Sequence, residues 1–111
     1  MLVELQDRDG GFEAISLMSV VGIRLEDKID DADTVEISVY FGAIINPGAP
    51  GGYVHPSAVL GEYNDYDDAL KVYEALMRLN WMFPGKVQIP SEDEDIEVAL
   101  KHWKKYYLTE S

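Results

Sequence analysis

The chain contains no cysteine, which excludes disulfide bonds, thiol chemistry and metal sites with cysteine ligands. Proteins of the reducing cytosol commonly have such a composition, so we expect a cytoplasmic location. The first residues, MLVELQDRDGG, also lack the basic stretch followed by an apolar stretch that marks a secretory signal peptide.

Basic residues are scarce. Nine Lys and Arg stand against 21 Asp and Glu, which gives a formal net charge of −12. A field of this sign repels phosphate, so binding to bare nucleic acid or to an anionic membrane surface is disfavoured. A basic protein surface or a cation suits the charge better. The alternative is that the surplus of acids only keeps the protein soluble.

Long apolar runs are absent as well. Residues 37–61 carry no Asp, Glu, Lys or Arg, but Pro47, Pro50 and several glycines within that span rule out a membrane-spanning helix. Hydrophobic residues make up 47% of the chain, which is enough to bury a core. We therefore expect residues 1–111 to form a single acidic, soluble domain.

Catalytic signatures are lacking too. The two histidines, His55 and His102, belong to no recognisable pattern, because there is no nucleophile elbow, HExxH motif or glycine-rich phosphate loop. Zinc would need mostly carboxylate ligands, which is unusual. We expect a protein that is not an enzyme and that needs no cofactor.

An amphipathic pattern at residues 63–83 predicts one helix. Asn64 or Asp65 can accept the free amide bonds at its start, and Pro84 ends it. Apolar residues recur at steps of three and four, and the face expected to be buried is Tyr66, Ala69, Leu70, Tyr73, Leu76, Met77 and Trp81.

A second helix is predicted to begin at Ser91, because Ser91 and Glu94 have the spacing of a capping box. The acids at residues 91–97 look like a binding patch. Capping and the helix dipole account for them without a partner, and we favour that interpretation.

Alternation of apolar and polar residues predicts strands at residues 2–6, 12–17, 21–26, 34–41 and 53–63. The first two are expected to pair through a turn at Asp9 and Gly10, and the last two through a longer loop. Residues 86–89 suffice only for an edge strand. Strands followed by helices predict an α+β fold, with an antiparallel sheet of about five strands packed against two C-terminal helices.

The spacing of Ile15, Leu17, Val20 and Ile23, with a strand that runs through residues 60–63 into a helix, resembles bacterial pleckstrin-homology-like domains and small phage proteins of no known role. The resemblance covers about residues 12–83 and includes no diagnostic motif. It implies short strands closed by a helix. The second helix departs from that pattern, and the missing basic cluster disfavours phosphoinositide binding.

No Lys or Arg occurs between Lys28 and Lys71, while acids flank the predicted strands at residues 34–41 and 53–63. Antiparallel pairing places the start of one strand beside the end of the other, so these acids are expected to converge. The alternative is that an acidic chain simply exposes its acids there. The candidate partner-binding residues are Asp30, Asp31, Asp33, Glu36, Glu62, Asp65, Asp67 and Asp68.

The other end of the same hairpin has an uncharged loop rich in Gly and Pro, residues 46–53. Such a composition is typical of the core of an interface, and longer loops often carry function. A long turn without any role has the same composition. The candidate interface residues are Ile45, Pro50, Tyr53 and His55.

The sequence supports three hypotheses on function. The first is a non-catalytic acidic module that binds a basic protein surface, for instance as an inhibitor that imitates nucleic acid, in the manner of phage or mobile-element proteins. The second is a self-associating structural subunit of a larger assembly that uses the uncharged loop. The third is a domain that binds Ca²⁺ or Mg²⁺ through the oxygen ligands at residues 30–36, although these do not match an EF-hand loop.

Overall fold

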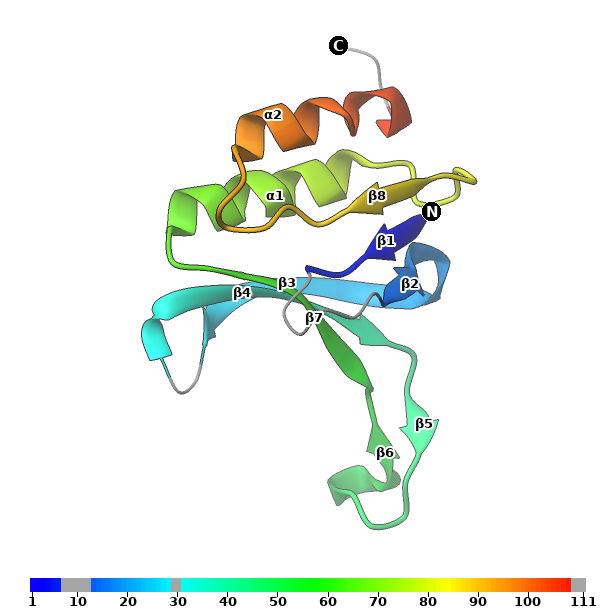
Figure 1. Ribbon diagram of the computed structural model, residues 1–111. Coiled ribbons are helices and arrows are strands. Elements are labelled where there is room, and N and C mark those ends of the chain that lie inside the picture. The colour runs from blue at the N-terminus through cyan, green and yellow to red at the C-terminus, as the bar shows by residue number, and fades with distance from the viewer. Residues whose placement is uncertain (7–12, 29–30, 109–111) are drawn as a thin grey trace.

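A computed structural model describes residues 1–6, 13–28 and 31–108 (Figure 1). These residues contain eight strands and two α-helices, in the order β1 (Leu2–Glu4), β2 (Ala14–Ser16), β3 (Val20–Lys28), β4 (Asp31–Phe41), β5 (Ile44–Ile45), β6 (Tyr53–Val54), β7 (Ser57–Tyr63), α1 (Tyr66–Arg78), β8 (Lys86–Gln88) and α2 (Ile96–Lys101). Three short 3₁₀ turns add η1 (Leu17–Ser19), η2 (Pro50–Gly52) and η3 (Lys104–Tyr106). The predicted α+β class is confirmed.

The central sheet has the strand order β3-β4-β7 and is antiparallel throughout. Alternate side chains of a strand point to opposite faces, and in β4 the apolar set Val35, Ile37 and Val39 is buried under α1. The predicted pairing of this strand with the one ending at Tyr63 is confirmed, since Val35 lies opposite Tyr63.

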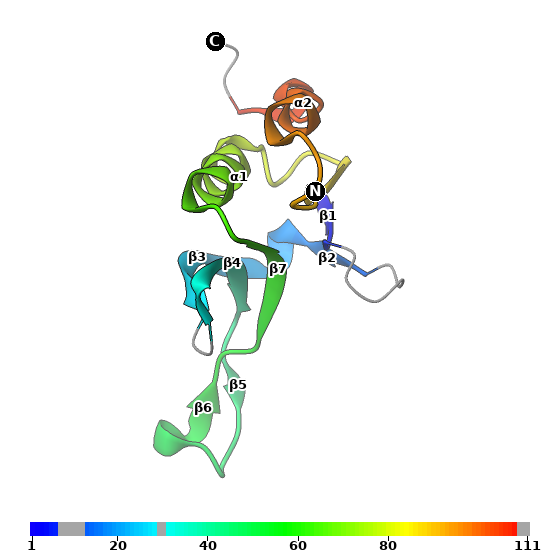
Figure 2. The same cartoon turned by 60° about the vertical axis from the view of Figure 1, so that its left-hand side comes forward.

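A second sheet has the order β2-β1-β8 and lies beside the first (Figure 2). The predicted N-terminal hairpin is confirmed, because β1 and β2 are antiparallel; the turn at Asp9 and Gly10 lies outside the described residues. β8 runs parallel to β1, with Val87 opposite Val3. The described strands thus form two three-stranded sheets and the β5-β6 ribbon, where the sequence predicted one sheet of about five strands.

Helix α1 is shorter and rotated relative to the prediction. It begins after Asp65, whose side chain accepts a hydrogen bond from the amide of Asp67 at 2.8 Å, and it ends at Arg78. The buried stripe consists of Ala69, Val72, Ala75 and Leu76. Tyr66 and Met77, which were predicted to be buried, are half exposed. Ala69 and Leu76 belong to the face predicted to be buried but Val72 and Ala75 do not, so the buried stripe is turned relative to the predicted face.

Helix α2 begins later than predicted. Ser91 donates its amide to the Glu94 carboxylate at 3.1 Å, but this closes a turn, and the N-cap is Asp95, which accepts from the amides of Glu97 and Val98. Trp103, just after α2, is almost fully buried. Figure 1 shows three layers, with α2 over α1 and α1 over the central sheet. None of the described helices is long and apolar enough to cross a membrane.

Gly61 in β7 is a site of close approach. A Cβ atom there would lie 2.9 Å from Cγ2 of Ile89 and 3.3 Å from the ring of Tyr63. We expect Gly61→Ala to lower the free energy of unfolding by about 1–3 kcal/mol, because both neighbours are buried and must move. Urea denaturation measures this change.

Gly42→Ala is the matched control, since a Cβ there meets nothing within 4 Å and the stability should change by less than about 0.5 kcal/mol. Equal stability of the two variants would contradict the close packing of β7 against residue 89.

Candidate functional site

The central sheet carries a row of three glutamates across its strands. Glu26 of β3 lies opposite Glu36 of β4, and Glu36 lies opposite Glu62 of β7. Like charges at directly opposed positions are unfavourable, and nearby cations offset the cost. Lys28 lies 3.3 Å from Glu62, and Arg24 lies 3.2 Å from Glu26. The predicted convergence of the two acidic stretches is confirmed for Glu36 and Glu62 by this register.

The start of α1 adds a second group of acids at the same end of the sheet. Asp65 caps the helix, and Asp67 and Asp68 lie in its first turn, where they complement the positive end of the helix dipole. Asp33, near the start of β4, is exposed. For Asp31, the first residue of β4, only the backbone is described. Asp30 lies outside the described residues.

A third acidic stretch joins the first two. The amide of Asn64 donates to the Glu92 carboxylate at 3.1 Å, which ties the segment before α2 to the start of α1. Glu92, Asp93, Glu94 and Asp95 are all exposed. Sequence reasoning explained these acids by capping and by the helix dipole, and did not place them with the others.

The lengths of the segments could have predicted that the acids before α2 lie beside the start of α1. Residues 84–90 extend over roughly 23 Å at about 3.3 Å per residue, which exceeds the roughly 20 Å of the 13-residue helix α1. The chain can therefore return along α1 in β8 and start α2 beside the start of α1, as Figure 1 shows.

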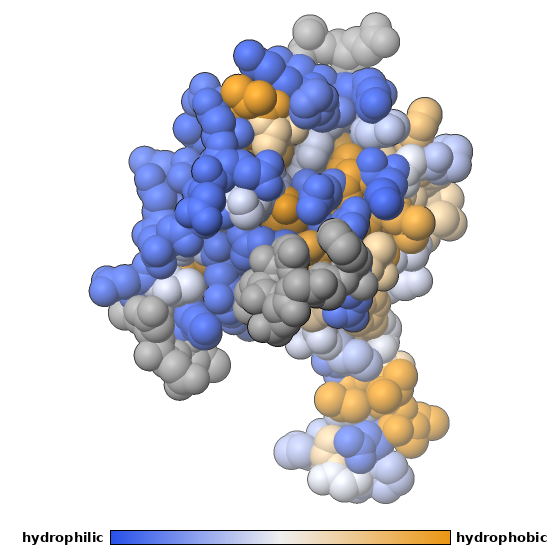
Figure 3. All heavy atoms as spheres, viewed as in Figure 1, coloured by the Kyte–Doolittle hydropathy of each residue, from blue (hydrophilic) through white to orange (hydrophobic). Residues whose placement is uncertain are grey.

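We call this surface the acidic end. Its carboxylates are Asp27, Asp33, Glu36, Glu62, Asp65, Asp67, Asp68, Glu92, Asp93, Glu94, Asp95 and Glu97. Among the described residues, Lys28 pairs with Glu62 and Lys71 pairs with Glu97 at 3.1 Å. The whole chain carries 21 acids against nine bases, so we expect a partner to meet a negative surface here. Figure 3 shows it as hydrophilic surface at the left of the molecule.

The acids of this surface raise the pKa values of two side chains, Tyr63 and Lys71. The Tyr63 hydroxyl is buried and donates to the carbonyl of Pro90 at 2.7 Å. Burial raises the pKa of Tyr63, and the negative charges of Glu94, Asp68 and Glu92 raise it further. The hydrogen bond to Glu97 raises the pKa of Lys71, with smaller contributions from Asp68 and Asp67. Acids from the starts of both helices thus act on the same groups.

Gln6 links two segments of the acidic end through hydrogen bonds to their backbones. Its side-chain amide donates to the carbonyls of Glu62 and Pro90, both at 3.2 Å, and its oxygen accepts from the amide of Glu62 at 2.9 Å. Gln6 also lines a hollow of about 290 Å³ with Asn64 and Asp93. The end of β1 is therefore joined to β7 and to the segment before α2.

Within the part of the chain that the structure describes, no three His, Asp or Glu side chains gather closely enough to hold a metal ion. The described residues therefore give the cation hypothesis no support, and Asp30 is not among them.

The predicted interface residues lie on a projecting arm, which we define as residues 43–55. It consists of the ribbon β5-β6 closed by η2, and Figures 1 and 2 show it extending away from both sheets. Ile45 is 77% exposed and Tyr53 is 62% exposed. Pro50 lies in the turn, and His55 at the base has its Nδ1 3.2 Å from the carbonyl oxygen of Phe41. Figure 3 shows apolar surface on this arm.

Comparison with known protein families, with curated proteins and with solved structures finds no match to this chain. A function must therefore be inferred from charge and geometry.

The Tyr63 contact yields a prediction with a pH signature. Tyr63→Phe removes the 2.7 Å hydrogen bond to the carbonyl of Pro90 and leaves that carbonyl only the longer one from Gln6 at 3.2 Å, so at neutral pH we expect a loss of about 0.5–1.5 kcal/mol in the free energy of unfolding. The pKa of Tyr63 is about 10 in the unfolded chain and is raised in the folded one. Stability from the neutral hydroxyl is therefore complete below about pH 10 and is lost as the pH rises above it.

The difference between the wild type and Tyr63→Phe should accordingly narrow above about pH 10 in urea denaturation series. Tyr66→Phe is the control, since Tyr66 is 54% exposed and should leave the curve unchanged. A difference that stays constant from pH 7 to pH 11 would contradict a Tyr63 hydroxyl held neutral by burial and by the acids around it.

Proposed function

We propose that this chain is a non-catalytic, cytoplasmic protein-binding module whose acidic end docks on a basic surface of a partner protein. The observation that supports it is the gathering of three acidic stretches, distant in sequence, at one end of the fold. Complementary charge accelerates encounter and selects against acidic partners.

A partner that normally binds nucleic acid suits this surface best. Cross-strand neighbours in a sheet are about 4.8 Å apart, so the glutamate row spaces its carboxylates regularly, as a phosphate backbone spaces its charges, while Arg24 and Lys28 pair with two of the three. In this form of the proposal the module is an inhibitor that occupies the partner's phosphate-binding groove, a strategy suited to phage or mobile-element proteins.

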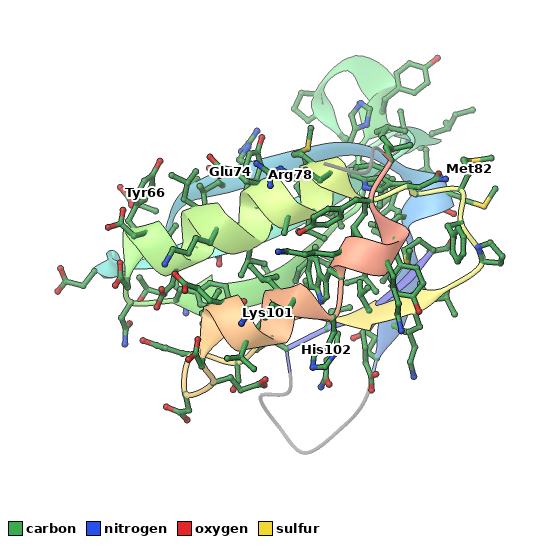
Figure 4. The ribbon with its side chains drawn as sticks, turned by 90° about the horizontal axis from the view of Figure 1, so that it is seen from above. Tyr66, Glu74, Arg78, Met82, Lys101 and His102 are labelled. Carbon is green, nitrogen blue, oxygen red and sulfur yellow. The ribbon has the colours of Figure 1, made fainter. Side chains whose placement is uncertain are left out.

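The two histidines support a role outside catalysis. His55 lies at the base of the arm, and His102 follows α2 on the opposite side of the molecule (Figures 1 and 4). Separate elements thus hold the side chains best suited to proton transfer near neutral pH, and they cannot act on one substrate together.

The test is capture of partners from lysate by the immobilised chain and by two charge-matched variants. Asp67→Asn with Asp93→Asn removes two exposed charges from the acidic end, while Glu13→Gln with Glu74→Gln removes two exposed charges elsewhere. We expect the first pair to weaken partner binding by roughly three- to tenfold and the second to leave it unchanged.

Binding should also fall steeply as salt rises to about 0.5 M, where surface charges are screened, and added duplex DNA should release a partner that binds nucleic acid. Equal loss in both variants, or retention undiminished by salt, would refute docking through the acidic end. Retention in the presence of duplex DNA would refute only the inhibitor form of the proposal.

A further inference from the structure

A groove of about 490 Å³ runs between β8 and α2. Val98 and Ala99 of α2 and the buried Trp103 line one wall, and β8 forms the other. Val98 is 51% exposed, so apolar surface faces the open groove. The groove therefore offers an apolar wall beside a strand.

That strand has an open edge. β8 is the last strand of its sheet, and the hydrogen bonds from Leu2 to Gly85 and from Ile89 to Glu4 show which of its residues face β1. In a parallel ladder alternate residues bond to the neighbouring strand, so the backbone groups of Lys86 and Gln88 point the other way. Both residues line the groove.

The arm has open edges of the same kind. Asn46 donates its amide to Gly52 at 2.9 Å, which makes Ile45 and Tyr53 the pair whose backbone N–H and C=O groups point out of the ribbon. Natural proteins blunt such edges with charged residues. Residues 42–61 contain no Asp, Glu, Lys or Arg, so this ribbon is unprotected.

The arm and the groove cannot meet within one molecule. Figures 1 and 2 show the arm below the central sheet and α2 on the far side of α1. A contact between them must join two copies through different surfaces, and such heterologous contacts build rings or open chains.

The charges around the groove do not oppose a second copy. Two chains of net charge −12 repel each other, but the arm brings no carboxylate into the contact. Lys86, which pairs with Glu4 at 3.3 Å, and Lys105 line the groove together with Glu94 and Asp95, so the charges of its lining are balanced. A balanced lining admits an uncharged arm, so strand pairing and the burial of apolar surface favour the contact.

We propose that the chain assembles head to tail, with the arm of one copy adding as a strand to the β8 edge of the next and covering the apolar wall formed by α2. An arm of this size buries less than the roughly 800 Å² per partner of a standard interface, so we expect dissociation constants in the micromolar range. The proposal is independent of the acidic end and its partner.

The test is sedimentation of the full-length chain from about 10 µM to about 1 mM, in about 0.3 M salt to screen the repulsion. The wild type should form species larger than a monomer as its concentration rises. Ile45→Asp in the arm and Val98→Glu in the groove should each raise the dissociation constant at least about tenfold. Met82→Asp is the control, since Met82 is 69% exposed at the end of the molecule where β8 begins (Figure 4).

Mixing the two interface variants gives the decisive result. The Ile45→Asp chain keeps its groove and the Val98→Glu chain keeps its arm, so the mixture should form a 1:1 heterodimer and nothing larger. A wild type that is monomeric throughout, a mixture that stays monomeric, or equal dissociation by Met82→Asp would each overturn the proposal. Pairing of arm with arm would instead let the Val98→Glu chain dimerise by itself as strongly as the wild type, and that result would also overturn the proposal.

Discussion

Tyr63 donates its buried hydroxyl to the carbonyl of Pro90 at 2.7 Å, and this contact joins the two halves of the fold. Tyr63 ends β7 just before α1, while Pro90 follows β8 and precedes the turn into α2. Gly61 lets Ile89 pack directly on β7, and Gln6 bonds to the backbone of both segments. The starts of both helices are therefore fixed beside one strand end.

This constraint concentrates charge at a cost. Twelve carboxylates share one end with Lys28 and Lys71, and mutual repulsion lowers stability there, less so in salt. The helix dipoles offset part of the cost, because Asp65 and Asp95 cap the two helices and further acids occupy the first turns. Structure alone thus explains the caps. It gives no reason for the glutamate row on the sheet, which no helix needs.

The features that could be predicted from the sequence are those that are encoded locally. The two-residue period of β4 gave its buried face and its partner strand, and Asp65 was one of two expected caps. The buried face of α1 was predicted only in part. Ala69 and Leu76 are buried as expected, but Ala75 was missed, because a small side chain weighs little in a hydrophobic pattern. The predicted N-cap of α2, Ser91, was wrong, because Asp95 caps that helix. The parallel pairing of β8 with β1 could not be predicted, because it joins segments more than 80 residues apart. The three residues of β8 are also too few to show a periodic pattern.

The two candidate surfaces depend on opposite physics, and the fold keeps them apart. Attraction through the acidic end acts at long range and weakens with salt, whereas pairing of the arm with a strand edge acts only on contact. Screening the repulsion between two acidic copies should strengthen that pairing. An arm carrying acids would not approach a second acidic molecule, so its lack of charge is the condition under which a chain of net charge −12 can assemble with itself. If the proposed assembly forms, its acidic ends are presented in multiple copies, and an array of weak docking sites binds more tightly than one.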